Sequence, residues 1–308
     1  MEWRHKNLIG LDGWTREELL FFLEQANYME EIISRPIKKA PALRGKMVVN
    51  CFFENSTRTR VSFEMAGKML SADVVNWSSS GSSTAKGETL RDTAWTLEAM
   101  GADAVVVRHG QVGVPDYLAK KLSSAAIINA GDGTNGHPTQ ALLDLHSAWK
   151  KLGELNGAKM AMIGDVLHSR VARSGIEAFR KMGVSVTLSG PLTLMPEDTD
   201  SLGVEYVSDV REAARDADIL YFLRIQAERQ EEGLIPSADE YHRRWGATES
   251  IVALASRNAV VMHPGPLNRG VEIASTVADG PKSVILGQIR SGVAVRMALL
   301  YLCLGGAR

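Results

Sequence analysis

Short apolar runs alternate with amphipathic segments along most of this chain, and that alternation constrains the fold more than any other feature. In the first half, the apolar runs that are typical of buried strands lie at 47–53, 74–77, 104–107 and 126–129. Helical patterns lie between them, around 61–70, 89–100 and 117–122. Because a helix between two strands of one sheet forms a crossover connection, the strands run parallel and helices cover both faces of the sheet. We therefore predict an α/β fold.

The same alternation restarts after a long helical segment at 138–152. The second set of predicted strands is 159–163, 185–188, 219–223 and 260–262, and a helix over 286–304 closes the chain. Helices are expected between these strands near 170–182, 210–215, 238–245 and 248–255. The 308 residues exceed the length of one domain, which is roughly 100–200 residues. We predict two doubly wound parallel-sheet domains joined by the long helix, 1–140 plus 288–308 and 141–287, with the C-terminal helix packing back on the first domain.

A capping box marks the first helix. Thr15 is followed three residues later by Glu18, the spacing at which each side chain bonds the backbone N–H of the other residue. Apolar residues then recur at helical spacing to about Ile33. The pattern predicts a helix that begins at Arg16.

Charge and cysteine content exclude several classes of protein. The chain has 35 basic and 36 acidic residues, a net charge of −1, which disfavours a broad face for nucleic acid or an acidic membrane. Its two cysteines cannot form a disulfide framework, and its N-terminus has no apolar signal core. Arg290 and Arg296 interrupt the apolar C-terminal stretch. We expect a cytoplasmic protein that binds neither nucleic acid nor membrane.

Ser-Thr-Arg-Thr-Arg at 56–60 is the most informative segment. It follows the first predicted strand, and a helix begins at about Arg58. The free N–H groups and dipole of a helix N-terminus attract anions, and hydroxyls and guanidinium groups add donors suited to phosphate. The alternative is that Ser56 or Thr57 only caps the helix. Two arginines directly after the hydroxyl residues favour an anion site.

Further polar residues lie where other predicted strands end. Arg108 ends the third strand, and the carboxyl ends of parallel strands line the ligand crevice of α/β proteins. His137 precedes Pro138, a residue suited to the first helical position, so His137 is expected as the N-cap. The positive helix end disfavours an imidazolium, and His137 is expected to be neutral. Gly-x-Gly-x-x-Gly at 131–136 leaves a dinucleotide site open as a rival interpretation.

The segment 56–60, after Phe-Phe-Glu at 52–54, resembles the carbamoyl-phosphate-binding motif of the aspartate and ornithine carbamoyltransferases. The resemblance continues in order through His-Pro-Thr-Gln at 137–140 and His-Pro-Gly-Pro at 263–266. It implies that the phosphate is held by four consecutive residues, Ser56, Thr57, Arg58 and Thr59. It also implies donors to the carbamoyl oxygen, namely Thr59, Arg108 and neutral His137, and a contact of Gln140 with the carbamoyl amino group.

Lys-Gly-Glu-Thr at 86–89 resembles the mobile loop of the aspartate enzymes of this family, which enters the active site of a neighbouring subunit. Ser82 and Lys86 are the matching positions. Without the resemblance, the segment is typical of a flexible Ser/Gly loop with a solvated lysine. The resemblance implies a homotrimer with shared active sites, in which a separated monomer is nearly inactive. Regulatory or dihydroorotase chains are further partners known in the family.

The second half carries the residues that the resemblance assigns to L-aspartate. Arg170 matches the arginine for the α-carboxylate, and Arg224 with Gln226 matches the group that binds the side-chain carboxylate. Backbone carbonyls at Gly265 and Pro266 are expected to accept hydrogen bonds from the carbamoyl NH₂. A guanidinium binds a carboxylate through two parallel hydrogen bonds, which a lysine cannot do.

The resemblance implies transfer of the carbamoyl group from carbamoyl phosphate to L-aspartate, giving N-carbamoyl-L-aspartate and phosphate, a step of pyrimidine biosynthesis. The residues expected to act on the reacting atoms are Arg58, Thr59, Lys86, Arg108 and His137. No cofactor is expected, and no metal, because the chain has neither His-Glu-x-x-His nor Cys-x-x-Cys. A different amine acceptor is one alternative, although ornithine is disfavoured because no cysteine lies near position 264. A dinucleotide-binding dehydrogenase and a catalytically silent subunit are the others.

Overall fold

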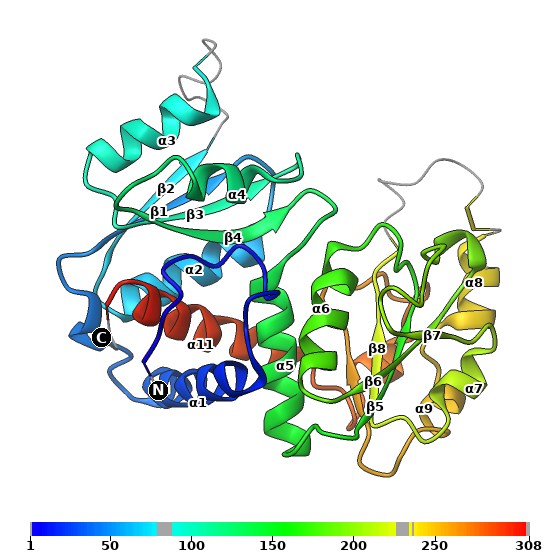
Figure 1. The fold of residues 1–308 in the computed structure, drawn as a ribbon. Helices are drawn as coiled ribbons and strands as arrows, with labels where there is room; N and C mark the ends of the chain where they lie inside the picture. Colours follow the sequence, from blue (N-terminus) through cyan, green and yellow to red (C-terminus); the bar gives the residue numbers. More distant parts are fainter. Residues whose placement is uncertain (1, 79–87, 226–233, 236, 306–308) are drawn as a thin grey trace. The chain divides into compact units, whose positions relative to one another are not determined.

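The computed structural model describes residues 2–78, 88–225, 234–235 and 237–305. The chain divides into two compact units, Met1–Leu142 with Arg290–Arg308, and Leu143–Ile289. Each unit contains one parallel sheet with helices on its faces, as the alternation of the sequence predicts. Figure 1 shows the elements of both units in the order of the chain.

The first unit contains a four-stranded parallel sheet in the order β2-β1-β3-β4. Its strands are β1 (Met47–Phe52), β2 (Asp73–Ser78), β3 (Ala104–His109) and β4 (Ala126–Asp132). Its helical segments are α1 (Arg16–Ser34), η1 (Pro41–Leu43), α2 (Thr57–Met69), α3 (Leu90–Ala99), α4 (Val114–Ala119), the start of α5 (Pro138–Leu152) and most of α11 (Ile285–Cys303). The expected capping box of α1 is present, because the Thr15 and Glu18 side chains each accept the backbone N–H of the other residue.

Alternate residues of these strands face opposite layers of helices. Val49, Cys51 and Val105 are buried in one apolar cluster with residues of α3 and α4. Figure 1 shows α3 and α4 on that side of the sheet, and α2 and α11 on the other. The predicted packing of the C-terminal helix on the first domain is confirmed. Both faces of the sheet are therefore covered by helices.

The second unit contains a five-stranded parallel sheet in the order β7-β6-β5-β8-β9. Its strands are β5 (Lys159–Ile163), β6 (Ser185–Ser189), β7 (Glu205–Tyr206), β8 (Ile219–Phe222) and β9 (Val260–Met262). Its other segments are α6 (Arg170–Lys181), η3 (Leu192–Leu194), α7 (Val210–Ala214), α8 (Ala238–Trp245), α9 (Glu249–Val252) and α10 (Ser275–Ala278). Residues of α7, α9 and α10 form one apolar cluster with alternate residues of β5, β8 and β9. On the other face, α6 packs near Met162, and a Cβ at its Gly175 would lie 3.5 Å from the Met162 methyl carbon, an ordinary van der Waals distance.

Each sheet has a topological switch point, where the chain changes the direction in which it adds strands. In the first sheet β2 lies on one side of β1, and β3 and β4 lie on the other. In the second sheet β6 and β7 lie on one side of β5, and β8 and β9 on the other. Open α/β sheets bind ligands outside the carboxyl ends of their strands at such a point. The β1–β3 and β5–β8 ends are therefore the places to look for binding residues.

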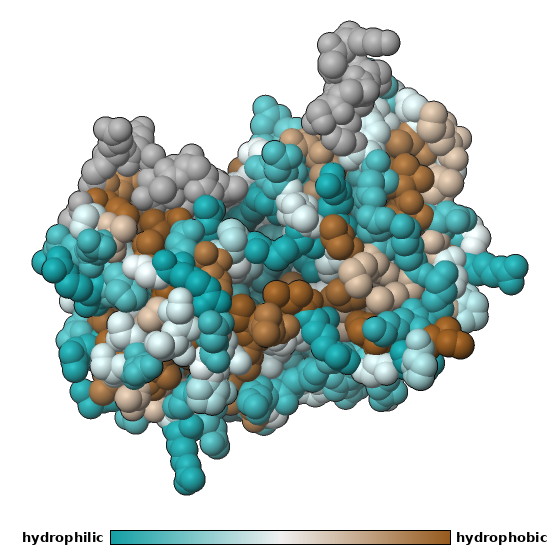
Figure 2. Space-filling model, turned by 180° about the vertical axis from the view of Figure 1, so that it is seen from behind, coloured by the Kyte–Doolittle hydropathy of each residue, from teal (hydrophilic) through white to brown (hydrophobic). Residues whose placement is uncertain are grey.

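The C-terminal helix α11 is the one helix of the described residues that is long and apolar enough to span a membrane by length and composition. However, 67% of its apolar window is buried inside the protein, which is also typical of a core helix. Buried Arg296 forms hydrogen bonds within it. On the face drawn in Figure 2, hydrophobic residues lie in separate groups among hydrophilic ones and form no continuous belt. We interpret α11 as a core helix.

Candidate active site

The predicted anion site is the N-terminus of α2, which follows the carboxyl end of β1. Ser56 is the N-cap residue with extended backbone, φ −157° and ψ 96°, and its side chain makes no capping hydrogen bond. In contrast, Thr15 and Thr89 do cap α1 and α3 with their hydroxyls. The interpretation of Ser56 as a capping side chain is therefore wrong. Thr57 and Arg58 are exposed, so the first turn of α2 offers backbone N–H groups, hydroxyls and a guanidinium to solvent.

Arg108 lies at the switch point of the first sheet. Its Cα pairs with that of Phe52, and the Phe53 N–H donates to the Arg108 carbonyl at 2.9 Å. The guanidinium Nε is 3.3 Å from Oε2 of Glu54, and Nη1 donates to the Ala130 carbonyl at 3.1 Å. A carboxylate and a carbonyl thus orient this cation beside the end of β1. An incoming phosphate would compete with the Glu54 carboxylate for the same donors.

His137 follows the turn after β4 and precedes the first residue of α5. The Gln140 and Ala141 N–H groups donate to its carbonyl at 2.9 and 3.2 Å, so His137 occupies the N-cap position as predicted. Its side chain is 4% exposed, and its Nδ1 is 3.4 Å from the Thr139 hydroxyl. Gln140 is half-buried in the first turn. Arg58, Arg108 and His137, three of the residues expected to bind carbamoyl phosphate, thus lie at or after the carboxyl ends of β1, β3 and β4.

The glycines at 131–136 have structural roles. Gly133 has φ +48°, and a Cβ there would lie 2.9 Å from both the Gly110 carbonyl and the Val112 nitrogen. Buried Asp132 accepts hydrogen bonds from the Gly113 N–H and the Asn135 side chain, so the loop is folded on its own polar groups. Gly133 lets the backbone approach the β3–α4 connection closely. Packing within the protein therefore accounts for this glycine without a bound dinucleotide.

His109, which we interpreted from the sequence as structural, lies beside this loop. Its ring centroid is 4.9 Å from that of Phe53, and its Nδ1 accepts the Gln111 N–H at 2.9 Å. Burial lowers the pKa of His109, although Glu54 and Asp132 act in the opposite direction. The imidazole therefore serves as a neutral acceptor within the loop.

In the second unit, two arginines lie at the switch point. Arg170 begins α6 after β5 and is only 4% exposed, while the N-cap Ser169 hydroxyl accepts the Ala172 N–H at 3.1 Å. Arg224 follows β8 and is half-buried. Because the Leu223 N–H donates to the Ile163 carbonyl at 2.8 Å, the chain that leads to Arg224 is fixed against the end of β5. The two predicted carboxylate-binding arginines therefore follow the adjacent strands β5 and β8, Arg170 at the start of α6 and Arg224 shortly after β8.

The turn after β9 is held by a buried histidine. The Gly265 N–H donates to His263 Nδ1 at 2.8 Å, so the proton of the neutral ring is on Nε2, which lies 3.2 Å from Glu272 Oε1. Gly265 has φ +63°, a backbone conformation that favours glycine. The Gly265–Pro266 peptide bond is cis, and Pro266 is exposed. Side-chain hydrogen bonds and backbone geometry thus both define this predicted substrate loop.

Sequence reasoning missed a buried polar network behind this turn. The His263 N–H donates to Gln288 Oε1 at 3.1 Å, and Gln288 Nε2 donates to Asp144 Oδ1 at 2.7 Å. Tyr221 Oη donates to the other Asp144 oxygen at 2.6 Å. The available signal was weak, since each of these residues is a single polar position within an apolar segment. We interpret the network as the support of the 263–266 turn.

Three predicted site residues, Ser82, Lys86 and Gln226, lie outside the described residues. Within the described part of the chain, no group of three or more His, Cys, Asp or Glu side chains is arranged to hold a metal ion.

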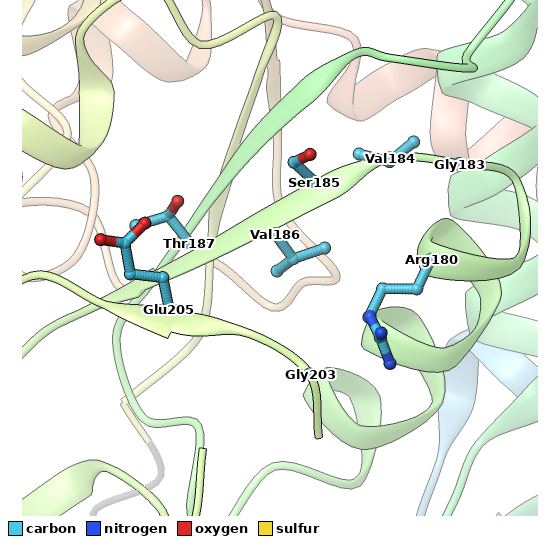
Figure 3. Close-up of a pocket in the computed structure, with 8 residues that line it drawn as sticks. All are labelled: Arg180, Gly183, Val184, Ser185, Val186, Thr187, Gly203 and Glu205. Atoms are coloured by element: carbon cyan, nitrogen blue, oxygen red, sulfur yellow. The ribbon is translucent and has the colours of Figure 1, made fainter. Parts of the chain in front are cut away.

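A pocket in the second unit lies away from these strand ends (Figure 3). Its lining residues are Arg180, Gly183, Val184, Ser185, Val186, Thr187, Gly203 and Glu205. Ser185 and Glu205 are the first residues of β6 and β7, so the pocket is at the amino ends of these strands. Arg180 Nη1 donates to the Leu202 carbonyl at 2.8 Å, and its guanidinium lies where a Gly203 side chain would be. None of the predicted site residues lines it.

Taken together, the two switch points place the predicted phosphate-binding residues of α2 in one α/β unit and the two predicted carboxylate-binding arginines in the other. Residues 6–150 match the family model of the aspartate/ornithine carbamoyltransferase carbamoyl-P binding domain. Residues 156–303 match the model of the Asp/Orn binding domain. The chain belongs to the aspartate/ornithine carbamoyltransferase family.

Individual proteins extend this similarity along the whole chain. The aspartate carbamoyltransferase catalytic subunit of Desulforamulus reducens is 53% identical over 306 residues, covering 99% of this chain and 98% of the relative. That of Anaeromyxobacter sp. strain K is 52% identical, covering 99% and 97%. Trypanosoma cruzi aspartate transcarbamoylase in complex with carbamoyl phosphate and aspartate has a TM-score of 0.88, with 29% identity and 97% coverage of each chain. Ornithine carbamoyltransferase from Pyrococcus furiosus has a TM-score of 0.87, with 28% identity and complete coverage of both chains.

Proposed function

We propose that the chain transfers the carbamoyl group of carbamoyl phosphate to the amino group of L-aspartate, in the cytoplasmic pathway to pyrimidines. The observation that carries the proposal is the uncapped start of α2 beside Arg108 at the switch point of the first sheet. The choice of aspartate as acceptor is supported by relatives 52–53% identical over the whole chain, which are named for that activity.

The phosphate end of the substrate is bound by the first turn of α2. Backbone N–H groups, the hydroxyls of Ser56, Thr57 and Thr59, and the Arg58 guanidinium supply donors, and the helix dipole favours the negative charge. Lys86 completes the set as a second cation. Because these donors surround phosphate oxygens, they also stabilise the charge that builds up on the leaving group.

The aspartate amine attacks the carbamoyl carbon, a C–N bond forms, and the carbonyl electrons move to oxygen. Thr59, Arg108 and His137 donate to this oxyanion, and each such donor contributes about 2.7–4 kcal/mol to transition-state stabilisation. The bond from carbon to the bridging phosphate oxygen then breaks, and phosphate leaves with its electron pair. A phosphate oxygen takes the proton that the amine loses. A basic side chain whose removal abolished turnover while both substrates still bound would contradict this last assignment.

The second unit orients aspartate so that its amine faces the carbamoyl carbon. Arg170 binds the α-carboxylate, and Arg224 with Gln226 binds the side-chain carboxylate, each guanidinium through paired hydrogen bonds. Gln140 and the carbonyls at Gly265 and Pro266 bind the carbamoyl NH₂. On this proposal, residues 1–140 with 288–308 serve carbamoyl phosphate, and residues 141–287 serve aspartate.

The working molecule is a homotrimer in which Ser82 and Lys86 enter the site of a neighbouring subunit. Support comes from the family and from exposed apolar side chains beside the open edge of the first sheet, at Val61 and Met65 on α2 and Val75 on edge strand β2. Native mass measurement tests the assembly. A mass of three chains is expected, added mass would reveal regulatory or dihydroorotase chains, and an active monomer would contradict shared sites.

Carbamoyl transfer by the purified oligomer tests the activity, with aspartate, ornithine and putrescine offered as acceptors in parallel. Arg58→Ala is expected to abolish transfer to aspartate, while Arg91→Ala, an exposed arginine on α3, is expected to leave it unchanged. Turnover with another amine alone would favour a different acceptor. No turnover with any acceptor would favour a silent subunit, and saturable NAD binding would revive the dehydrogenase alternative.

A further inference from the structure

Arg296 is a buried cation in the first unit that lies between the two helices bearing the phosphate and carbonyl donors. It is 3% exposed, and its Nη1 donates to the Ser62 hydroxyl of α2 and to the Gly292 carbonyl, both at 3.0 Å. Its guanidinium carbon lies 5.1 Å from the centroid of the Phe63 ring. Burial of a guanidinium is unfavourable unless its donors find acceptors. Arg296 is therefore fixed in place relative to α2.

The second Arg296 nitrogen reaches α5. Nη2 is 3.5 Å from the hydroxyl oxygen of Thr139, which is fully buried, and the same hydroxyl is 3.4 Å from His137 Nδ1. An arginine can only donate, so the Thr139 oxygen acts as the acceptor in the first contact. A hydroxyl has one proton, and its remaining contact is with the imidazole. The Thr139 proton consequently points to Nδ1 of His137.

The direction of these contacts determines the tautomer of the histidine. A ring nitrogen that accepts a hydrogen bond carries no proton, so neutral His137 carries its proton on Nε2. Nε2–H is then the donor of the neutral ring.

We propose that Arg296 is a positioning residue that acts through Thr139 to hold His137 as the neutral Nε2–H tautomer. The value of that tautomer for catalysis rests on the proposed function, in which Nε2–H donates to the carbamoyl oxygen. The opposite tautomer would present a lone pair to a developing oxyanion and would repel it. Arg296 contacts no reacting atom in this arrangement. It acts by directing the hydroxyl proton of Thr139 towards His137 Nδ1.

Ring-¹⁵N histidine NMR of the intact oligomer tests the tautomer without substrate. The His137 signal is assigned by its loss in His137→Gln, since the chain has 7 histidines. In the wild type and Thr139→Ser, Nδ1 is expected unprotonated and Nε2 protonated. Thr139→Val has the same shape without the hydroxyl, and a mixture of tautomers is expected. A proton on Nδ1 in the wild type, or an unchanged tautomer in Thr139→Val, would overturn the proposal.

Kinetics supply the second readout. Thr139→Val is expected to lower kcat between about tenfold and a hundredfold, part of the 10²- to 10³-fold cost of losing one oxyanion donor, with the KM for aspartate nearly unchanged. Thr139→Ser restores kcat, whereas Arg296→Gln lowers it. If Arg296→Gln does not fold, the two Thr139 variants still decide the matter. If the wild type shows the expected His137 tautomer but does not transfer the carbamoyl group, the proposed function is overturned and the tautomer inference stands.

Discussion

Removal of the hydrogen bond from Tyr221 to Asp144 measures how much the buried polar network contributes to the stability of the second unit. Both side chains are 1% exposed, and the bond is 2.6 Å long. A hydrogen bond to a charged group contributes about 1.5–3 kcal/mol, against about 0.5–1.5 kcal/mol for a neutral pair. Tyr221→Phe removes the hydroxyl alone, so we expect it to lower the free energy of unfolding of the second unit by about 1.5–3 kcal/mol.

Tyr206→Phe is the matched control. The Tyr206 hydroxyl donates to the Gly190 carbonyl at 3.0 Å, and its half-buried side chain leaves water able to replace the bond. We expect a loss below about 1 kcal/mol for this variant. Hydrogen exchange of β5 and β8 amides, with urea unfolding of each variant, measures both changes within the relevant unit. Equal losses in the two variants would refute the argument that the Tyr221–Asp144 bond stabilises the second unit more than the half-buried Tyr206–Gly190 bond does.

The same pair predicts sensitivity to alkali. Burial, followed by the neighbouring Asp144 charge and hydrogen bond, raises the pKa of Tyr221 well above its ordinary value of 10.0. Above that pH the unfolded chain loses the phenol proton and the folded chain keeps it, so stability falls by up to about 1.4 kcal/mol per pH unit for this group. The wild type is therefore expected to lose stability above pH 10 more steeply than Tyr221→Phe. Tyr241, whose pKa is also raised by burial, contributes a slope common to both.

Three further outcomes follow from local geometry. Because the Ser56 side chain does not cap α2, Ser56→Ala is expected to change the free energy of unfolding by less than about 0.5 kcal/mol and to raise the KM for carbamoyl phosphate. Thr15→Ala, which removes a capping hydroxyl, is expected to lower the free energy of thermal unfolding by about 1 kcal/mol. Gly133→Ala is expected to lower the free energy of unfolding by about 2 kcal/mol more than Gly157→Ala does, because both glycines have positive φ but only a Cβ at Gly133 would meet backbone atoms. Equal losses of stability in the two variants would contradict the close backbone approach at Gly133. Burial raises the pKa of both cysteine thiols to about 12, so iodoacetamide at pH 8 is expected to label them only after unfolding.

Alternation of apolar and amphipathic segments was sufficient to predict both sheets and most of their strands. The predicted α8 at 238–245 coincides with the observed helix, and β5 begins and ends as expected. The strand β7 was missed because two residues at a sheet edge are too short for any periodicity. The helix α10, with four residues, was missed for the same reason. The order of the strands, and hence the two switch points, comes from packing and was not predicted.

Candidate site positions could be identified from the sequence where a motif begins a helix or ends a strand, because such places expose backbone donors. The roles assigned to them came from the family resemblance and stay predictions. The residues that support these positions could not be identified from the sequence. Gln288 bonds Asp144 across 144 positions, and Arg296 reaches Thr139 across 157 and Ser62 across 234. No local pattern carries such information, because it depends on where α11 packs.

The polar positions of α11 are informative for that reason. An all-apolar core helix would stabilise its surroundings at least as well, since replacement of buried charged groups by apolar residues of similar volume is often neutral or stabilising. Yet α11 buries Gln288 in the second unit and Arg296 in the first, and each ends in a hydrogen bond next to a predicted substrate loop. Gln288 bonds the backbone of His263, and Arg296 bonds the neighbour of His137. A gain in stability alone does not account for the placement of Gln288 and Arg296. Their placement is accounted for if they orient the groups that bind a small anionic substrate.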